Sequence, residues 1–173
     1  MKNPLKKEYL NQYQAREDGG YTFTGAYYCF HGGSFKKRFV LLSVLLCAIG
    51  ALIIASGCLN SAGMRNSFYV IIPYIGEVSA FFALVWNSVK LFTKGERVKE
   101  YIYKSAYPRI PRAALATAML AGVSVLCSVI FIILNGPEGG VAKCVLYNVF
   151  KLLIISICIV FDKVIKNTEY VLE

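Results

Sequence analysis

Acidic residues, histidine and sequence signatures of catalysis are scarce in this 173-residue chain. It has ten aspartates and glutamates against nineteen lysines and arginines, and a single histidine, His31. His31 lies two residues after Cys29, but no nearby acid or cysteine completes the four-ligand set that zinc prefers. No phosphate-binding loop and no G-x-G-x-x-G, G-x-S-x-G or H-E-x-x-H motif occurs. The sequence therefore predicts no metal, no cofactor and no enzymatic activity.

The six cysteines form no C-x-x-C pair, which argues against redox catalysis. Cys47, Cys127 and Cys158 fall away from the ends of the apolar stretches, where cysteine usually acts as a small apolar residue. Cys29 is expected on the cytoplasmic side and reduced. Cys58 and Cys144 are both expected near the outer surface, and a disulfide between them is left open.

Polar residues are nearly missing from four long stretches of the chain. Overall, 57% of the residues are hydrophobic and the mean hydropathy is +0.54. The stretches span about 39–59, 68–92, 113–134 and 141–161. Each has about 20 residues or more, the length that an α-helix needs to cross the ~30 Å hydrocarbon layer. The sequence therefore predicts an all-α membrane protein with four transmembrane helices in an antiparallel bundle, residues 39–161.

The basic residues alternate between rich and poor segments along the chain. Seven precede the first apolar stretch, one lies between the first two, and six lie in the connection 93–112. One marks the turn before the last stretch, and two follow it in the tail 162–173. By the positive-inside rule, we expect a multi-pass cell-membrane protein whose N- and C-termini and middle connection are cytoplasmic.

The net charge of +9 bears on the partners of the protein. In a soluble protein such a charge would suggest nucleic acid. Here the basic residues gather next to the apolar stretches, where the anionic lipids of the inner leaflet are a sufficient partner. We therefore expect a bilayer with an anionic inner leaflet as partner and no nucleic acid.

The N-terminal segment 1–38 is expected to lie at the cytoplasmic surface. Leu5, Tyr9 and Tyr13 are spaced four residues apart, which is typical of a short amphipathic helix on the membrane; a frayed tail is the alternative. Its glycines and aromatic residues predict an irregular interfacial segment over 21–35, with Ser34 capping the first span.

The middle connection 93–112 predicts a short helix with Val98, Tyr101 and Ile102 on one side. The short, similar segments KKEYL (6–10) and VKEYI (98–102) each precede a pair of apolar stretches. Whether they mark a duplicated two-span unit is left open, because the spacers to the following spans differ greatly in length.

Small residues mark the expected helix contacts. Ala114, Ala118 and Gly122 recur every four residues in the third span, and Gly76 and Ala80 do so in the second. Such faces let another helix approach closely. Contact within one bundle is the simpler interpretation, and a seam between two copies of the chain is the alternative.

Two opposite charges fall well inside the spans. At ~1.5 Å per residue, Glu77 lies roughly 13 Å and Lys151 roughly 15 Å below the outer boundary. A charge near the bilayer centre costs on the order of 2.5–3.5 kcal/mol even on the lenient insertion scale, so we expect the two to pair. Tyr147 and Asn148, one turn before Lys151, are predicted to support the pair.

Three interpretations of Glu77 are left open. The pair Glu77–Lys151 would fix helix packing, or Glu77 would serve a substrate, proton or partner, or one of the two lies shallower and reaches water. Pro73 is expected to kink the helix one turn before Glu77, as in transporters, which favours the second interpretation slightly.

These features favour one function over another. The main hypothesis is a non-enzymatic accessory or assembly subunit that binds a protein partner in the membrane or forms a homo-oligomer. The alternative is a small transporter or channel-like subunit that uses Glu77.

Overall fold

The computed structural model describes residues 13–15, 21–23, 25–31, 34–59, 66–137 and 139–172. The protein is mostly helical, and four of its helices are long and apolar enough to cross a membrane. They are α2 (Phe35–Leu59), α4 (Phe68–Phe92), α6 (Arg109–Asn135) and α7 (Val141–Lys166). The prediction of four such helices is confirmed. Three of them extend beyond the apolar stretches by one or more turns, so that basic residues lie on their ends.

The ends of α6 show how local sequence sets helix limits. Pro108 occupies the N-cap position, where its missing N–H is not needed. At the other end, Gly136, Gly139 and Gly140 all have positive φ, at 78°, 76° and 99°. Side chains with a Cβ rarely adopt that conformation, so glycine permits the tight connection from α6 to α7.

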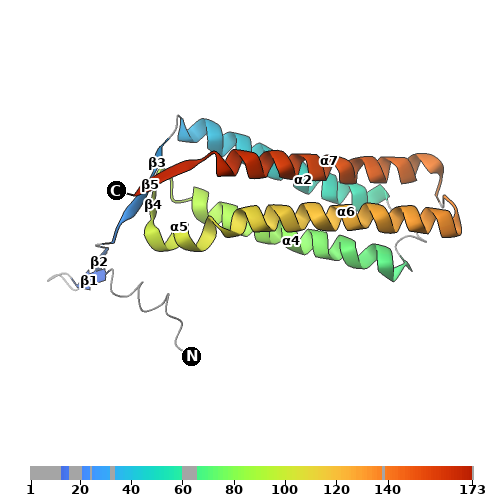
Figure 1. Cartoon of the computed structure of the whole chain (residues 1–173), viewed down its shortest axis with the longest axis horizontal. Coiled ribbons are helices and arrows are strands. Elements are labelled where there is room, and N and C mark those ends of the chain that lie inside the picture. Colours follow the sequence, from blue (N-terminus) through green and yellow to red (C-terminus); the bar gives the residue numbers. More distant parts are fainter. Residues whose placement is uncertain are drawn as a thin grey trace, which may run out of the picture.

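The long helices lie side by side (Figure 1). α4 packs along α6, α6 along α7, and α7 along α2. α2 and α4 meet over a smaller area. There two glycines of α2 leave space for aromatic rings of α4. A Cβ on Gly50 would lie 3.0 Å from Cζ of Phe81, and a Cβ on Gly57 would lie 3.0 Å from Cζ of Tyr74.

A three-stranded antiparallel sheet lies at one end of the helices (Figure 1), so the expectation of an all-α fold is wrong in this respect. Its strands are β4 (Arg97–Lys99), β3 (Tyr27–His31) and β5 (Glu169–Leu172), in the order β4-β3-β5. Tyr28 is opposite Val98 on one side, and Cys29 is opposite Val171 on the other. The sheet joins the N-terminal segment, the middle connection and the C-terminal tail.

The sheet corrects two expectations for the connecting segments. Residues 27–31 form a strand rather than an irregular segment, because β4 and β5 supply backbone partners from distant parts of the chain. Val98 lies in β4, and the short helix α5 begins two residues later (Glu100–Ala106).

The predicted N-terminal amphipathic helix lies mostly outside the described residues. Its described part forms β1 (Tyr13–Ala15), which pairs with β2 (Tyr21–Phe23). A helix running through Tyr13 is therefore wrong. Its spacing of apolar residues favoured a helix, but the antiparallel partner β2 stabilises an extended backbone there.

Aromatic and basic side chains fix the sheet to the helices. The Tyr103 ring of α5 stacks on Tyr28 of β3, with centroids 4.2 Å apart, and on Tyr107, with centroids 4.7 Å apart. From α2, Arg38 Nη1 donates a hydrogen bond of 2.5 Å to the carbonyl of Asn167, just after α7. The Arg38 guanidinium also lies 5.4 Å from the ring centroid of Phe30 in β3. These contacts hold the sheet against α5 and the start of α2, and they join α2 to the residue that follows α7.

Candidate functional site

A buried ion pair lies between α4 and α7. Lys151 Nζ of α7 donates a hydrogen bond of 2.6 Å to Oε2 of Glu77 in α4. Both side chains have 0% exposure, so neither reaches the lipid-facing surface. The structure thus brings together the two charges that the depth argument placed at the same level. Because neither side chain is exposed to water, each charge is stabilised by the opposite charge of the other.

Two aromatic rings enclose the ammonium group of Lys151. Its Nζ lies 4.7 Å from the ring centroid of Tyr74 and 5.2 Å from that of Tyr147. Both distances are within the range in which an aromatic face attracts a cation. The hydroxyl of Tyr74 donates a hydrogen bond of 3.2 Å to the carbonyl of Ile53 in α2. The ion pair and its rings therefore connect α2, α4 and α7.

Beside the pair lie three buried polar atoms from three different helices. Oε1 of Glu77, Oγ of Ser124 and the hydroxyl of Tyr147 have no hydrogen-bond partner within the described part of the chain. The Ser124 hydroxyl, from α6, neighbours both the Glu77 carboxylate and the Tyr147 hydroxyl. Two hydroxyl groups and a carboxylate oxygen supply donors and acceptors suited to a water molecule or a small polar ligand.

The other predicted supporting residue, Asn148, does not belong to this cluster. Its Oδ1 accepts a 2.6 Å hydrogen bond from Ser128 of α6, and its Nδ2 donates one of 2.9 Å to the carbonyl of Cys144. Asn148 therefore connects α7 to α6 away from the ion pair.

Sequence reasoning missed Ser124 and Tyr74. Sequence position could have suggested both residues. Tyr74 lies one turn before Glu77, and Ser124 lies in the third span, two residues after the small residue Gly122.

The predicted packing residues lie against neighbouring helices of the same chain. A Cβ on Gly76 would lie 3.3 Å from Leu120 of α6, and one on Gly122 would lie 4.0 Å from Ile155 of α7. Ala114 has 0% exposure. Ala80 and Ala118 are partly buried. Gly76, Gly122 and Ala114 thus pack within one chain, and a seam between two copies stays a prediction.

The remaining candidates form no site in the described structure. His31 is exposed in β3, opposite Glu169. Among the described residues, no group of three or more His, Cys, Asp or Glu side chains is placed to hold a metal ion. Cys58 and Cys144 are not joined by a disulfide in this structure.

No family model, curated protein or solved structure matches this chain. The function is therefore inferred from the geometry of the two regions just described, the buried ion pair and the sheet.

Proposed function

We propose that this protein is a non-enzymatic, multi-pass subunit of the cell membrane that helps a membrane protein partner to assemble. In this proposal its termini and middle connection face the cytoplasm. The observation that carries the orientation is the sheet β4-β3-β5. Its strands come from the three segments whose basic residues predict a cytoplasmic position, and strands of one sheet must lie on the same side of a membrane.

The sheet also supports the binding role. Its outer strand β5 pairs with β3 on one edge, and no other described strand pairs with its second edge. Val171 and Leu172 of β5 are 48% and 55% exposed. Apolar strands at a sheet edge present backbone donors and acceptors that an extended segment of another protein can join. The charges of Glu77 and Lys151, by contrast, pair with each other within the chain, which supports a structural role for them.

A photo-crosslinking amino acid placed at position 171 tests this proposal in cells. We expect a discrete crosslink to one membrane protein, whose assembled amount falls when the gene for this chain is deleted and recovers with the wild-type copy. The matched control is position 133, where Ile133 is 76% exposed at the opposite end of α6 and should crosslink to lipid alone.

Two results would contradict the accessory role. One is a crosslink pattern at position 171 that equals the control pattern. The other is a deletion strain in which no membrane protein changes in assembled amount.

One observation favours a second candidate, a small transporter or channel-like subunit. It is the group of buried polar atoms beside the pair, Oε1 of Glu77, Oγ of Ser124 and the Tyr147 hydroxyl, none of which has a hydrogen-bond partner among the described residues. Carboxylates next to such groups inside membranes serve proton and ion pathways in many pumps and transporters.

The variant Glu77→Gln separates the two candidates. Glutamine keeps the shape of the side chain and a carbonyl for Lys151 but cannot exchange a proton. Purified protein in vesicles containing a pH-sensitive dye should show no more proton flux than empty vesicles if the accessory role is correct. Flux that the wild type supports and Glu77→Gln abolishes would establish the transporter instead. Flux that survives the substitution would exclude Glu77 from the pathway.

A further inference from the structure

A groove of about 390 Å³ lies where the end of α4 meets α5. Its apolar wall comes from Trp86 and Val89 of α4 and from Ile102 of α5. Lys90 and Lys94 lie on the same groove, further along the chain from Trp86 and so nearer the sheet end of the molecule. The lining thus changes from apolar to basic in the direction in which a membrane gives way to water.

A second, more polar pocket of about 250 Å³ adjoins the groove. Lys94, Tyr101 and Ile102 line both spaces. The second pocket adds Arg97 and Lys99, together with Tyr27 of β3. No aspartate or glutamate of the described chain is among the residues that line either space. The two adjoining spaces are hereafter called the α4–α5 groove, and Lys94, Arg97 and Lys99 line its more polar end.

Trp86 marks the depth of the α4–α5 groove. Its side chain is 63% exposed, and the ammonium of Lys90 lies 5.1 Å from the centroid of its ring. Tryptophan collects at the boundary between hydrocarbon and headgroups, where its ring is in an apolar layer and its N–H meets polar groups. The apolar half of the groove is therefore at acyl-chain depth and the basic half at headgroup depth.

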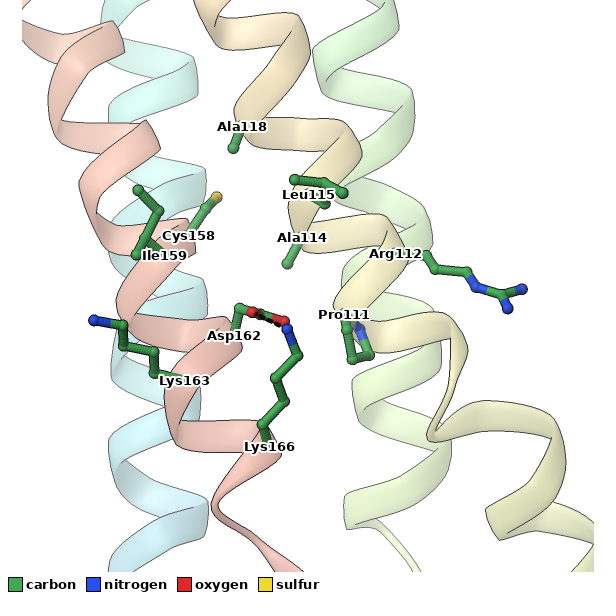
Figure 2. Close-up of a pocket in the computed structure, with 10 residues that line it drawn as sticks. All are labelled: Pro111, Arg112, Ala114, Leu115, Ala118, Cys158, Ile159, Asp162, Lys163 and Lys166. Carbon is green, nitrogen blue, oxygen red and sulfur yellow. Dashed lines mark hydrogen bonds and ion pairs between the residues drawn. The ribbon is translucent and has the colours of Figure 1, made fainter.

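A comparable groove between α6 and α7 is less suited to an anion (Figure 2). At its mouth the carboxylate of Asp162 lies 2.5 Å from Lys166 Nζ and neutralises it. The remaining basic side chains, Arg112 and Lys163, extend away from the space on opposite sides (Figure 2). Among the described residues that line the α4–α5 groove, basic side chains are more numerous and none is a carboxylate.

We propose that the α4–α5 groove binds an anionic glycerophospholipid of the cytoplasmic leaflet. An acyl chain lies along Trp86 and Val89, and the phosphodiester lies among Lys90, Lys94 and Arg97. Basic pockets beside transmembrane helices recognise anionic headgroups in this way, and each Lys or Arg near the surface contributes about 1 kcal/mol, or about a fivefold preference. The proposal uses the proposed orientation only to name the leaflet, and it does not depend on a protein partner.

Trp86 provides the test, because it is the only tryptophan in the chain. The full-length protein is placed in phosphatidylcholine vesicles that contain a small fraction of phospholipid with brominated acyl chains, which quench nearby tryptophan. We expect brominated phosphatidylglycerol to quench Trp86 more strongly than brominated phosphatidylcholine at the same fraction. Inorganic phosphate in the buffer should leave this difference unchanged, since the acyl chain contributes to binding.

Two double variants show whether the preference belongs to the groove. Lys94→Gln/Arg97→Gln should lower the preference for phosphatidylglycerol by about fivefold for each cation removed. Arg112→Gln/Lys163→Gln removes the same amount of charge beside the other groove and should keep the wild-type preference.

Equal quenching of the wild type by the two brominated lipids would overturn the proposal, whatever the variants do. An equal loss in both double variants would also overturn it, because the effect would then reflect net charge alone. Loss of the preference in phosphate buffer would show that the groove recognises free phosphate and not a lipid. None of these outcomes affects the proposed partner binding, which the crosslink at position 171 tests separately.

Discussion

The buried ion pair between the helices and the sheet at their end differ in how their polar groups are stabilised. Glu77 and Lys151 are both fully buried, and each is the charged partner of the other. At the sheet end the charges are numerous, and two ion pairs among the described residues, Lys104–Glu100 and Lys166–Asp162, each join residues within one helix. The backbones of three distant segments connect the chain at that end, and Arg38 of α2 adds contacts with Asn167 and Phe30.

The difference follows from the medium around each region. In hydrocarbon a charge has no solvent to stabilise it, so a partner on another helix is required and the pair fixes which helices meet. Near water a charge needs no partner, and exposed ion pairs contribute little. Specific connections there come from backbone pairing and from aromatic packing, as in the stack of Tyr28, Tyr103 and Tyr107.

The largest expected effect is on the interior pair. Lys151→Met leaves the Glu77 carboxylate buried without its charged partner, and breaking a buried pair in this way costs about 3–5 kcal/mol of unfolding free energy. Thermal unfolding in detergent, followed by size-exclusion chromatography, should show early loss of the monodisperse protein. The control is Lys143→Met, because Lys143 is exposed at the start of the same helix and should tolerate the change.

The double variant Glu77→Leu/Lys151→Met sharpens this prediction. Apolar residues of similar volume remove both charges, so we expect a thermal midpoint near that of the wild type or above it. A double variant as unstable as Lys151→Met would show that the cost lies in packing around Lys151 and not in an unpaired charge.

A smaller effect is expected when a charge is removed at the sheet end. Arg38→Gln loses the hydrogen bond to Asn167 and the contact with Phe30, at a cost of about 1 kcal/mol. Hydrogen–deuterium exchange should become faster in residues 167–172 and stay unchanged in the long helices. Lys37→Gln, the exposed neighbour with the same charge, should leave the exchange of 167–172 at the wild-type rate. If exchange became equally faster in both variants, the effect would come from the loss of a positive charge and not from the contacts of Arg38.

The effect that is smallest at neutral pH concerns Tyr170, whose buried hydroxyl has no hydrogen-bond partner among the described residues. Burial raises the pKa of Tyr170 from 10.0 to about 12, with a further contribution from Tyr107. The unfolded chain loses this proton at lower pH than the folded protein, so stability is retained below pH 10 and falls between pH 10 and 12.

The variant Tyr170→Phe tests this shift. It should be as stable as the wild type at pH 7, because the hydroxyl forms no bond there, and less sensitive to pH above 10. A phenolate absorbance titration should show one late-titrating tyrosine fewer than in the wild type. An unchanged late phase would mean that Tyr170 titrates as an exposed tyrosine.

The local sequence was sufficient to predict much of the interior. Helix length, apolar composition and the depths of Glu77 and Lys151 follow from residue counting at a fixed rise, so four spans and a facing pair of charges were predictable. The contributions of Tyr74 and Ser124 were not, because they depend on the rotation of α4 and α6 about their own axes. Asn148 shows the same limit, since a residue next to Tyr147 in the chain points toward α6 and not toward the pair.

What the sequence alone determined, then, is the number of long apolar helices, their limits to within a few turns, and the pairing of the two interior charges. Each depends on properties of neighbouring residues in a medium that penalises every unpaired polar group. The tertiary structure decided the rest, above all the sheet in which Tyr28 meets Val98 and Cys29 meets Val171. Strands of three to five residues carry too little local pattern to name their partners, because their pairing depends on segments that only the folded helices bring to one end.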